Sequence, residues 1–231
     1  MSAHLQREID RLKKNILALS AVVEENVRKA VHAIERRDEK LARRAMATDV
    51  EIDHREIDVE EECLKILALH QPVAIDLRFI VACLKINNDL ERIGDLAVNI
   101  AERAVFLGNR EPVEVPFDFP TMAEKVRTML KNSLDALVNL DARLARHVCR
   151  SDDEVDEINR HMYDQVKDGI RRRPEDVDSL IHLLSVSRHL ERIADHATNI
   201  AEDVIYMLEG VIVRHQAEDY LTEDPQEPGQ P

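Results

Sequence analysis

Residues 90–102 read LERIGDLAVNIAE, and residues 190–202 read LERIADHATNIAE, which is identical to the first stretch at 10 of 13 positions. A weaker repeat lies upstream of each copy, where residues 38–43 (DEKLAR) correspond to residues 141–146 (DARLAR). This second correspondence continues from residues 49–53 to residues 152–156. Similarity at a fixed spacing is typical of a duplicated structural unit. The sequence therefore predicts two equivalent halves.

Each half has room for three long helices. The chain contains only 5 Gly and 8 Pro in 231 residues, and the prolines leave long stretches free for helix. Leu5, Leu12 and Leu19 begin a heptad pattern typical of a bundle helix. Asp38 is expected to cap the next helix, and Gly108 to end the third. The predicted helices run to Arg36 and over 39–69, 76–107, 120–140, 141–172 and 174–209, the last ending before Gly210.

These helices predict an all-α fold of two pseudo-symmetric three-helix bundles. The stretch NREPVEVPFDF at residues 109–119 clusters proline without a helical period, which is typical of a linker. We therefore expect a first bundle over 1–108 and a second over 120–215. Residues 216–231 are acidic and rich in proline, so we expect a disordered tail.

Composition excludes several classes of function. The 46 acidic and 32 basic residues give a formal charge of −14, which would repel a nucleic-acid backbone. No apolar run approaches the roughly 20 residues that a membrane-spanning helix needs, and the first residues do not resemble a secretory signal. Three scattered cysteines are more typical of reduced thiols than of a disulfide framework. A cytoplasmic protein is expected.

Carboxylates dominate the repeated segments. Glu91, Asp95, Asn99 and Glu102 fall on one stripe of an ideal helix, opposite an apolar face, so we expect them at the bundle surface. In the repeat upstream, Asp49 and Asp53 lie one turn apart, as do Asp152 and Asp156 in the second half. Like charges at this spacing destabilise an isolated helix by a few tenths of a kcal/mol, and a bound cation would reverse that effect.

A solvated acidic face is the alternative to a metal site, because most charge stripes are solvent-exposed. Recurrence of the same spacing in both halves, including the asparagine, favours metal binding. Carboxylate and amide oxygens suit Mg²⁺, Mn²⁺ or iron, whereas His189 and His196 in the second half would tolerate zinc or iron. The identity of the metal stays open, and His196 taken alone is expected to be a surface histidine.

The two LERI segments, each preceded by an acidic helix, together with QPVAIDLRF at residues 71–79, resemble the PhoU family. This resemblance implies two three-helix bundles with metal ions or multinuclear metal clusters on E/DxxxD motifs. It also implies a regulator without catalytic activity, which couples the ATPase subunit of a phosphate-specific ABC transporter to a sensor histidine kinase. Phosphate-starvation genes would then stay repressed in high phosphate. A homodimer that reaches the membrane only through its partners is expected. The motif positions are Asp49, Asp53, Glu91 and Asp95 in the first half and Asp152, Asp156, Glu191 and Asp195 in the second.

The sequence leaves two alternatives to a metal-binding regulator. One is a di-metal carboxylate oxidase or metal-storage bundle of the ferritin kind, which needs a Glu-x-x-His motif on each of two helices. Only Glu51 to His54 has this spacing. The other is a helical scaffold without metal. Catalysis of other kinds is not expected, because the sequence has no Gly-rich phosphate loop, GxSxG or HExxH motif.

The second half also departs from the family pattern, since it lacks the QPVAxDLRF segment.

Overall fold

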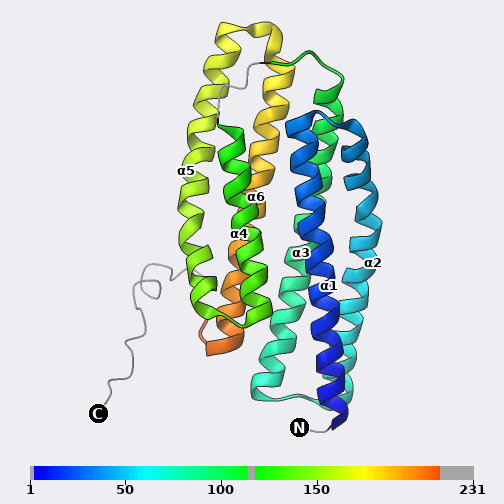
Figure 1. Cartoon of the computed structure of the whole chain (residues 1–231). Coiled ribbons are helices and arrows are strands. Elements are labelled where there is room, and N and C mark those ends of the chain that lie inside the picture. The colour runs from blue at the N-terminus through cyan, green and yellow to red at the C-terminus, as the bar shows by residue number, and fades with distance from the viewer. Residues whose placement is uncertain (1–2, 114–117, 214–231) are drawn as a thin grey trace, which may run out of the picture.

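The computed structural model describes residues 3–113 and 118–213, and within these ranges the fold is all-α, as predicted. No strand occurs in this part of the chain (Figure 1). The expected tail at 216–231 and residues 114–117 of the expected linker lie outside the described residues. The elements are α1 (Ala3–Arg36), α2 (Glu39–His70), α3 (Ala74–Gly108), α4 (Phe119–Asn139), α5 (Ala142–Arg172), a 3-10 turn η1 (Pro174–Asp176) and α6 (Val177–Glu209).

Side chains cap several helices where the sequence predicts a boundary. Asp38 is the N-cap of α2, and its side chain accepts a hydrogen bond from the Leu41 amide at 3.0 Å. Gly210 follows α6 in the left-handed conformation, with φ of 74°.

The expected C-cap at Gly108 is wrong. Gly108 is the last residue of α3, and Asn109 follows as the cap. The Asn109 side-chain amide donates to the Val105 carbonyl at 2.9 Å and satisfies a group that the helix end leaves unpaired. Two helix starts also differ, because α3 begins before residue 76 and the stretch after Arg173 forms a 3-10 turn before α6.

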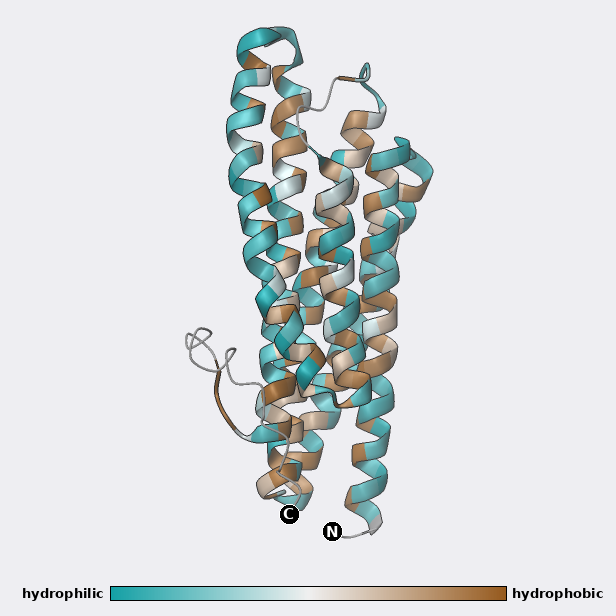
Figure 2. Ribbon diagram, turned by 60° about the vertical axis from the view of Figure 1, so that its left-hand side comes forward, coloured by the Kyte–Doolittle hydropathy of each residue, from teal (hydrophilic) through white to brown (hydrophobic). Residues whose placement is uncertain are grey.

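The six helices form two three-helix bundles that lie side by side, α1 to α3 in one and α4 to α6 in the other (Figure 1). Apolar residues line the inner faces of the helices, and hydrophilic residues cover much of the outside (Figure 2). Leu12, Ile52 and Leu90 are fully buried in the first bundle, as are Leu130 and Ile193 in the second. One continuous apolar core passes through both bundles.

The bundles are joined where α3 packs against α6. Lys85 of α3 forms an ion pair with Asp203 of α6, with 3.0 Å between Nζ and Oδ1. The Nδ1 atom of His196 lies 2.8 Å from Oδ1 of Asp89, and the Asn199 amide donates to the same oxygen at 3.3 Å. His196 is therefore a partly buried contact between bundles, and its assignment as a surface histidine is wrong.

No helix within the described ranges combines the length and the apolar composition that crossing a membrane requires.

The two halves differ in the side-chain sizes at two equivalent core positions. A Cβ atom at Gly94 would lie 3.1 Å from both Cδ1 and Cγ2 of the fully buried Ile52. By the offsets of the repeat, the equivalent residues in the second half are Ala194 and Val155, which are also fully buried. The first half thus has glycine beside the larger isoleucine. The second half has alanine and the smaller valine at the equivalent positions.

We predict that G94A lowers the free energy of unfolding by about 1 kcal/mol, because overpacking outweighs the gain in helix propensity. Combining G94A with I52V should cost less than the sum of the two single substitutions, by roughly 0.5–1 kcal/mol. Urea unfolding of the four proteins measures this coupling.

G108A is the matched control, since the nearest atom to its added Cβ, the Arg37 carbonyl oxygen, lies at an ordinary 3.7 Å. It should leave stability unchanged or slightly higher. Additive effects of G94A and I52V would show that the contact does not limit packing.

Candidate metal centres

Two neighbouring helices in each half bring the predicted carboxylates together. Asp49 and Asp53 lie one turn apart on α2, which packs against α3 with Glu91 and Asp95. These four residues are called the first carboxylate cluster. The second carboxylate cluster has the same arrangement on α5 and α6, and it consists of Asp152, Asp156, Glu191 and Asp195.

The second cluster contains a close group of three carboxylates. One oxygen each from Asp156, Glu191 and Asp195 lies within 4.8 Å of the other two. Burial raises the pKa of Glu191 and of Asp195, and the nearby carboxylates raise both further. Such spacing suits ligands around one cation, because oxygens bound to one hard ion must lie close together.

Asp152 is the most perturbed member of this cluster. Burial, followed by the charges of Asp195 and Asp156, raises the pKa of Asp152 to about 6. The Thr198 hydroxyl lies nearby, and its interaction with the carboxylate opposes this rise in pKa. Even so, neither the buried Oδ1 of Asp152 nor the Thr198 hydroxyl has a hydrogen-bond partner of good geometry among the described residues. A buried oxygen left in this state fits a cation ligand.

The first cluster is more open. Burial raises the pKa of Asp49, helped by Asp53 and Asp95, and burial also raises the pKa of Glu91. Arg92 already supplies positive charge here, since its guanidinium lies 3.4 Å from Glu91 and 3.5 Å from Asp95. Within the described ranges, no three carboxylates of this cluster approach one another as closely as those of the second.

Glu56 is a further acidic residue at the first cluster, and the motif did not reveal it. It lies seven residues after Asp49 on α2, which is a same-face spacing, and its charge contributes to the raised pKa of Glu91. Asn87 donates a hydrogen bond to Glu56 Oε1 at 3.0 Å. The equivalent position in the second half is Asn159, which accepts a hydrogen bond from Ser187 at 3.0 Å. The two clusters therefore differ in negative charge.

The two histidines named with the second cluster do not join it. His196 contacts Asp89, and His189 lies 3.2 Å from the Ser185 hydroxyl through its Nε2 atom. Burial and the charge of Arg103 lower the pKa of His189. Neither histidine belongs to the close carboxylate group in the described part of the chain, so the structure does not support them as zinc or iron ligands.

The predicted surface position of the acidic stripe is correct only in part. Glu102 is exposed, whereas Glu91, Asp95 and Asn99 are half-buried. The neighbouring helix α2 partly covers them, which a helical projection of α3 alone does not reveal. Partial burial strengthens the repulsion between carboxylates, because solvent screens half-buried charges less than exposed ones.

The fold and the two clusters define a class of duplicated helical proteins with one acidic cluster on each half. The PhoU domain model matches this chain twice, over residues 16–104 and 119–204. The chain belongs to the PhoU family.

Close relatives and solved structures agree with this assignment. The phosphate-specific transport system accessory protein PhoU homolog of Aquifex aeolicus is 38% identical over 92% of this chain and 96% of its own length. The homolog of Pseudomonas putida is 35% identical over 98% of this chain and 89% of its own. The crystal structure of PhoU from Pseudomonas aeruginosa aligns with a TM-score of 0.86 at 35% identity, covering 89% of this chain and 99% of that one.

The raised pKa of Asp152 predicts a pH dependence of stability in the metal-free protein. The folded-state pKa of about 6 lies above the ordinary value of 3.8, so the folded protein holds this proton more tightly than the unfolded chain does. The resulting contribution to stability is complete below about pH 4 and is lost as the pH rises through about 6. D152N should therefore raise the melting temperature at pH 7.5, and this gain should shrink toward pH 4.

Thermal melting of chelator-treated protein across this pH range measures the effect. D164N, which changes an exposed carboxylate on the same helix, is the control and should leave the melting temperature at pH 7.5 nearly unchanged. An equal effect of D152N at both ends of the range would contradict the assignment.

Proposed function

We propose that this protein is a metal-binding regulator of phosphate homeostasis. It would couple a phosphate-specific ABC transporter, through the ATPase subunit, to a sensor histidine kinase, and so keep phosphate-starvation genes repressed in high phosphate. The observation that carries this proposal is the position of the two PhoU matches. Each contains one complete carboxylate cluster. The solved relative from Streptococcus pneumoniae, 27% identical with a TM-score of 0.82, is described as a phosphate transport system regulatory protein.

Metal binding is the chemical part of the proposal. The carboxylate oxygens of the two clusters suit a hard ion such as Mg²⁺, Mn²⁺ or iron. The unsatisfied Asp152 oxygen and the close group at Asp156 support binding in the second half. A cation there would relieve repulsion among the neighbouring carboxylates, so metal occupancy would change the charge of the α5–α6 surface. That change is a means of altering contact with a protein partner.

The ferritin-like alternative has little support. Glu51, which begins the single Glu-x-x-His spacing, is exposed and forms an ion pair with Arg55 at 2.9 Å. His54 is exposed as well. A di-iron oxidase needs these groups to project into a bundle core, where this chain places Ile52. We therefore propose a regulatory protein rather than an enzyme, acting as a homodimer in the cytoplasm.

Replacement of two ligands tests the metal site directly. We predict that E191Q/D195N lowers the amount of metal bound per chain by the share that the second cluster holds. The two substitutions keep side-chain volume but remove two charges. The fold should persist, because the substitution also removes like-charge repulsion. Elemental analysis of protein purified without chelator and then loaded with Mn²⁺ or Fe²⁺ measures the loss. D164N is again the matched control. Unchanged metal content in E191Q/D195N would rule out these ligands.

Deletion of the gene tests the regulatory part. In high phosphate, the deletion strain should express alkaline phosphatase and phosphate-uptake genes, and the wild-type gene should restore repression. Complementation with E191Q/D195N then asks whether the metal site matters, and we expect incomplete repression. Continued repression in the deletion strain would contradict the proposed regulation whatever the metal content.

A further inference from the structure

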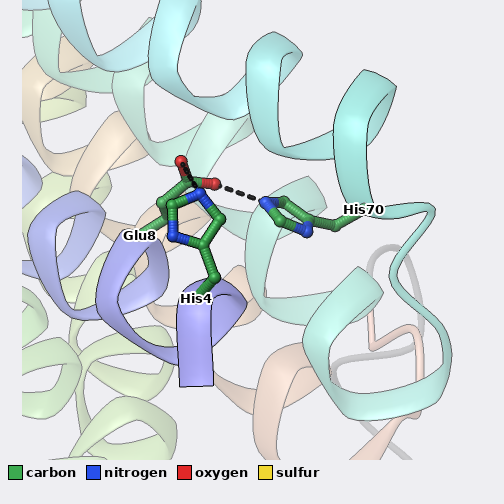
Figure 3. A group of neighbouring side chains, drawn as sticks. All are labelled: His4, Glu8 and His70. Atoms are coloured by element: carbon green, nitrogen blue, oxygen red, sulfur yellow. Dashed lines mark hydrogen bonds and ion pairs between the residues drawn. The ribbon is translucent and has the colours of Figure 1, made fainter. Parts of the chain in front are cut away.

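Two histidines and a glutamate meet at one end of the first bundle, away from the repeated motifs. His4 and Glu8 lie one turn apart at the start of α1, and His70 is the last residue of α2 (Figure 3). The two helices form an antiparallel hairpin, so the end of α2 lies beside the start of α1 (Figure 1). These three residues are called the histidine site.

The side chains of the histidine site point toward one another. His70 Nε2 lies 2.7 Å from one oxygen of Glu8, and His4 Nε2 lies 3.5 Å from the other. The two imidazole rings meet edge to face with centroids 5.4 Å apart (Figure 3). One donor atom from each residue lies within 4.8 Å of the other two. Ligand atoms around tetrahedral Zn²⁺ lie roughly 3.3 Å apart, given Zn–N distances of about 2.0–2.1 Å. Small side-chain movements would therefore bring all three donors to one ion.

We propose that His4, Glu8 and His70 form a transition-metal site that prefers Zn²⁺ or a similar imidazole-binding ion. Two imidazoles and one carboxylate are a common ligand set for zinc, and they leave a fourth position for water. The carboxylate clusters, by contrast, offer oxygen ligands only. The two kinds of site are thus selective for different ions, and this inference does not depend on the proposed regulatory function.

Burial and access at the histidine site suit a bound ion. Glu8 is only 8% exposed, and the His70 side chain is 15% exposed, so packing holds both in place. The His4 side chain is largely exposed and lies on the solvent side, which gives an ion a route to the carboxylate. An ion here would join the first turn of α1 to the last turn of α2.

Lys65 is the competing cation. Its ammonium lies 3.1 Å from Glu8 Oε1, where it supplies the positive charge that a metal ion would replace. The same ammonium lies 3.6 Å from Glu62 Oε1, a buried atom that accepts no hydrogen bond within the described part of the chain. Lys65 can therefore turn to Glu62 when a metal ion binds Glu8.

Cobalt spectroscopy tests the histidine site. Four-coordinate Co²⁺ absorbs visible light strongly, whereas six-coordinate Co²⁺ in an all-oxygen site absorbs weakly. We expect metal-free full-length protein to develop the strong bands on titration with Co²⁺ and to lose them when Zn²⁺ is added. H4N and H70N should each remove the bands and weaken Zn²⁺ binding by about tenfold or more, measured by competition with a chromogenic chelator.

Two controls make the outcome decisive. H161N changes an exposed histidine on α5, and E191Q/D195N disables the second carboxylate cluster, and both proteins should keep the strong bands. H4N guards against misfolding, because His4 is exposed at the helix start. The proposal is wrong if wild-type protein gives only weak bands, if H4N and H70N keep the strong bands, or if E191Q/D195N loses them. The first two results leave open whether the carboxylate clusters bind metal, whereas loss of the bands in E191Q/D195N would place the ion at the second cluster. None of the three decides whether the protein represses phosphate-starvation genes.

Discussion

Helices α3 and α6 pack against each other between the two bundles, and this contact limits where every other group can lie. Both helices bury residues along most of their length, so their polar faces have little room at the centre of the molecule. Two polar pairs join the helices there, Lys85 with Asp203 and Asp89 with His196. The repeated carboxylates instead face α2 and α5, the outer helices of each bundle. Two acidic clusters on separate bundles follow from this single packing arrangement.

Concentrated negative charge is the main electrostatic feature of the molecule. The sequence has a formal charge of −14, and many acidic residues of the described helices are exposed, where water and salt screen their repulsion. In the clusters most of the carboxylates are half-buried, and they lie next to one another. Burial and the neighbouring charges raise the pKa of Asp49, Glu91, Asp152, Glu191 and Asp195. Crowded like charges of this kind lower stability, and proteins retain such unfavourable groups mainly at functional sites.

The sequence predicted the features that depend on local pattern and on the repeat. Helix positions, the cap at Asp38 and the pairing of Asp49 with Asp53 follow from spacing along one helix. It could not predict contacts that depend on the register between helices. His4 and Glu8 show an i, i+4 spacing, but the approach of His70 requires α1 and α2 to have nearly equal lengths, 34 and 32 residues.

The contact between Asp89 and His196 was missed for the same reason. It depends on how one bundle is placed along the other, and no periodicity within a helix contains that information. Glu56 could have been found, because it continues the face of Asp49 and Asp53, but it has no acidic equivalent in the second half. A search guided by the repeat therefore passes over it.

The different packing at Gly94 and Ala194 bears on how the duplicated halves evolve. Recombination between two similar gene segments tends to make them identical again. Copying α3 onto α6 would place glycine opposite Val155 and remove a methyl group from a filled core, while the reverse copy would press alanine against Ile52. Either exchange would therefore lower stability, because each half has side chains that fit its own core better. Selection for stability would then preserve the divergence of the two halves at these core positions.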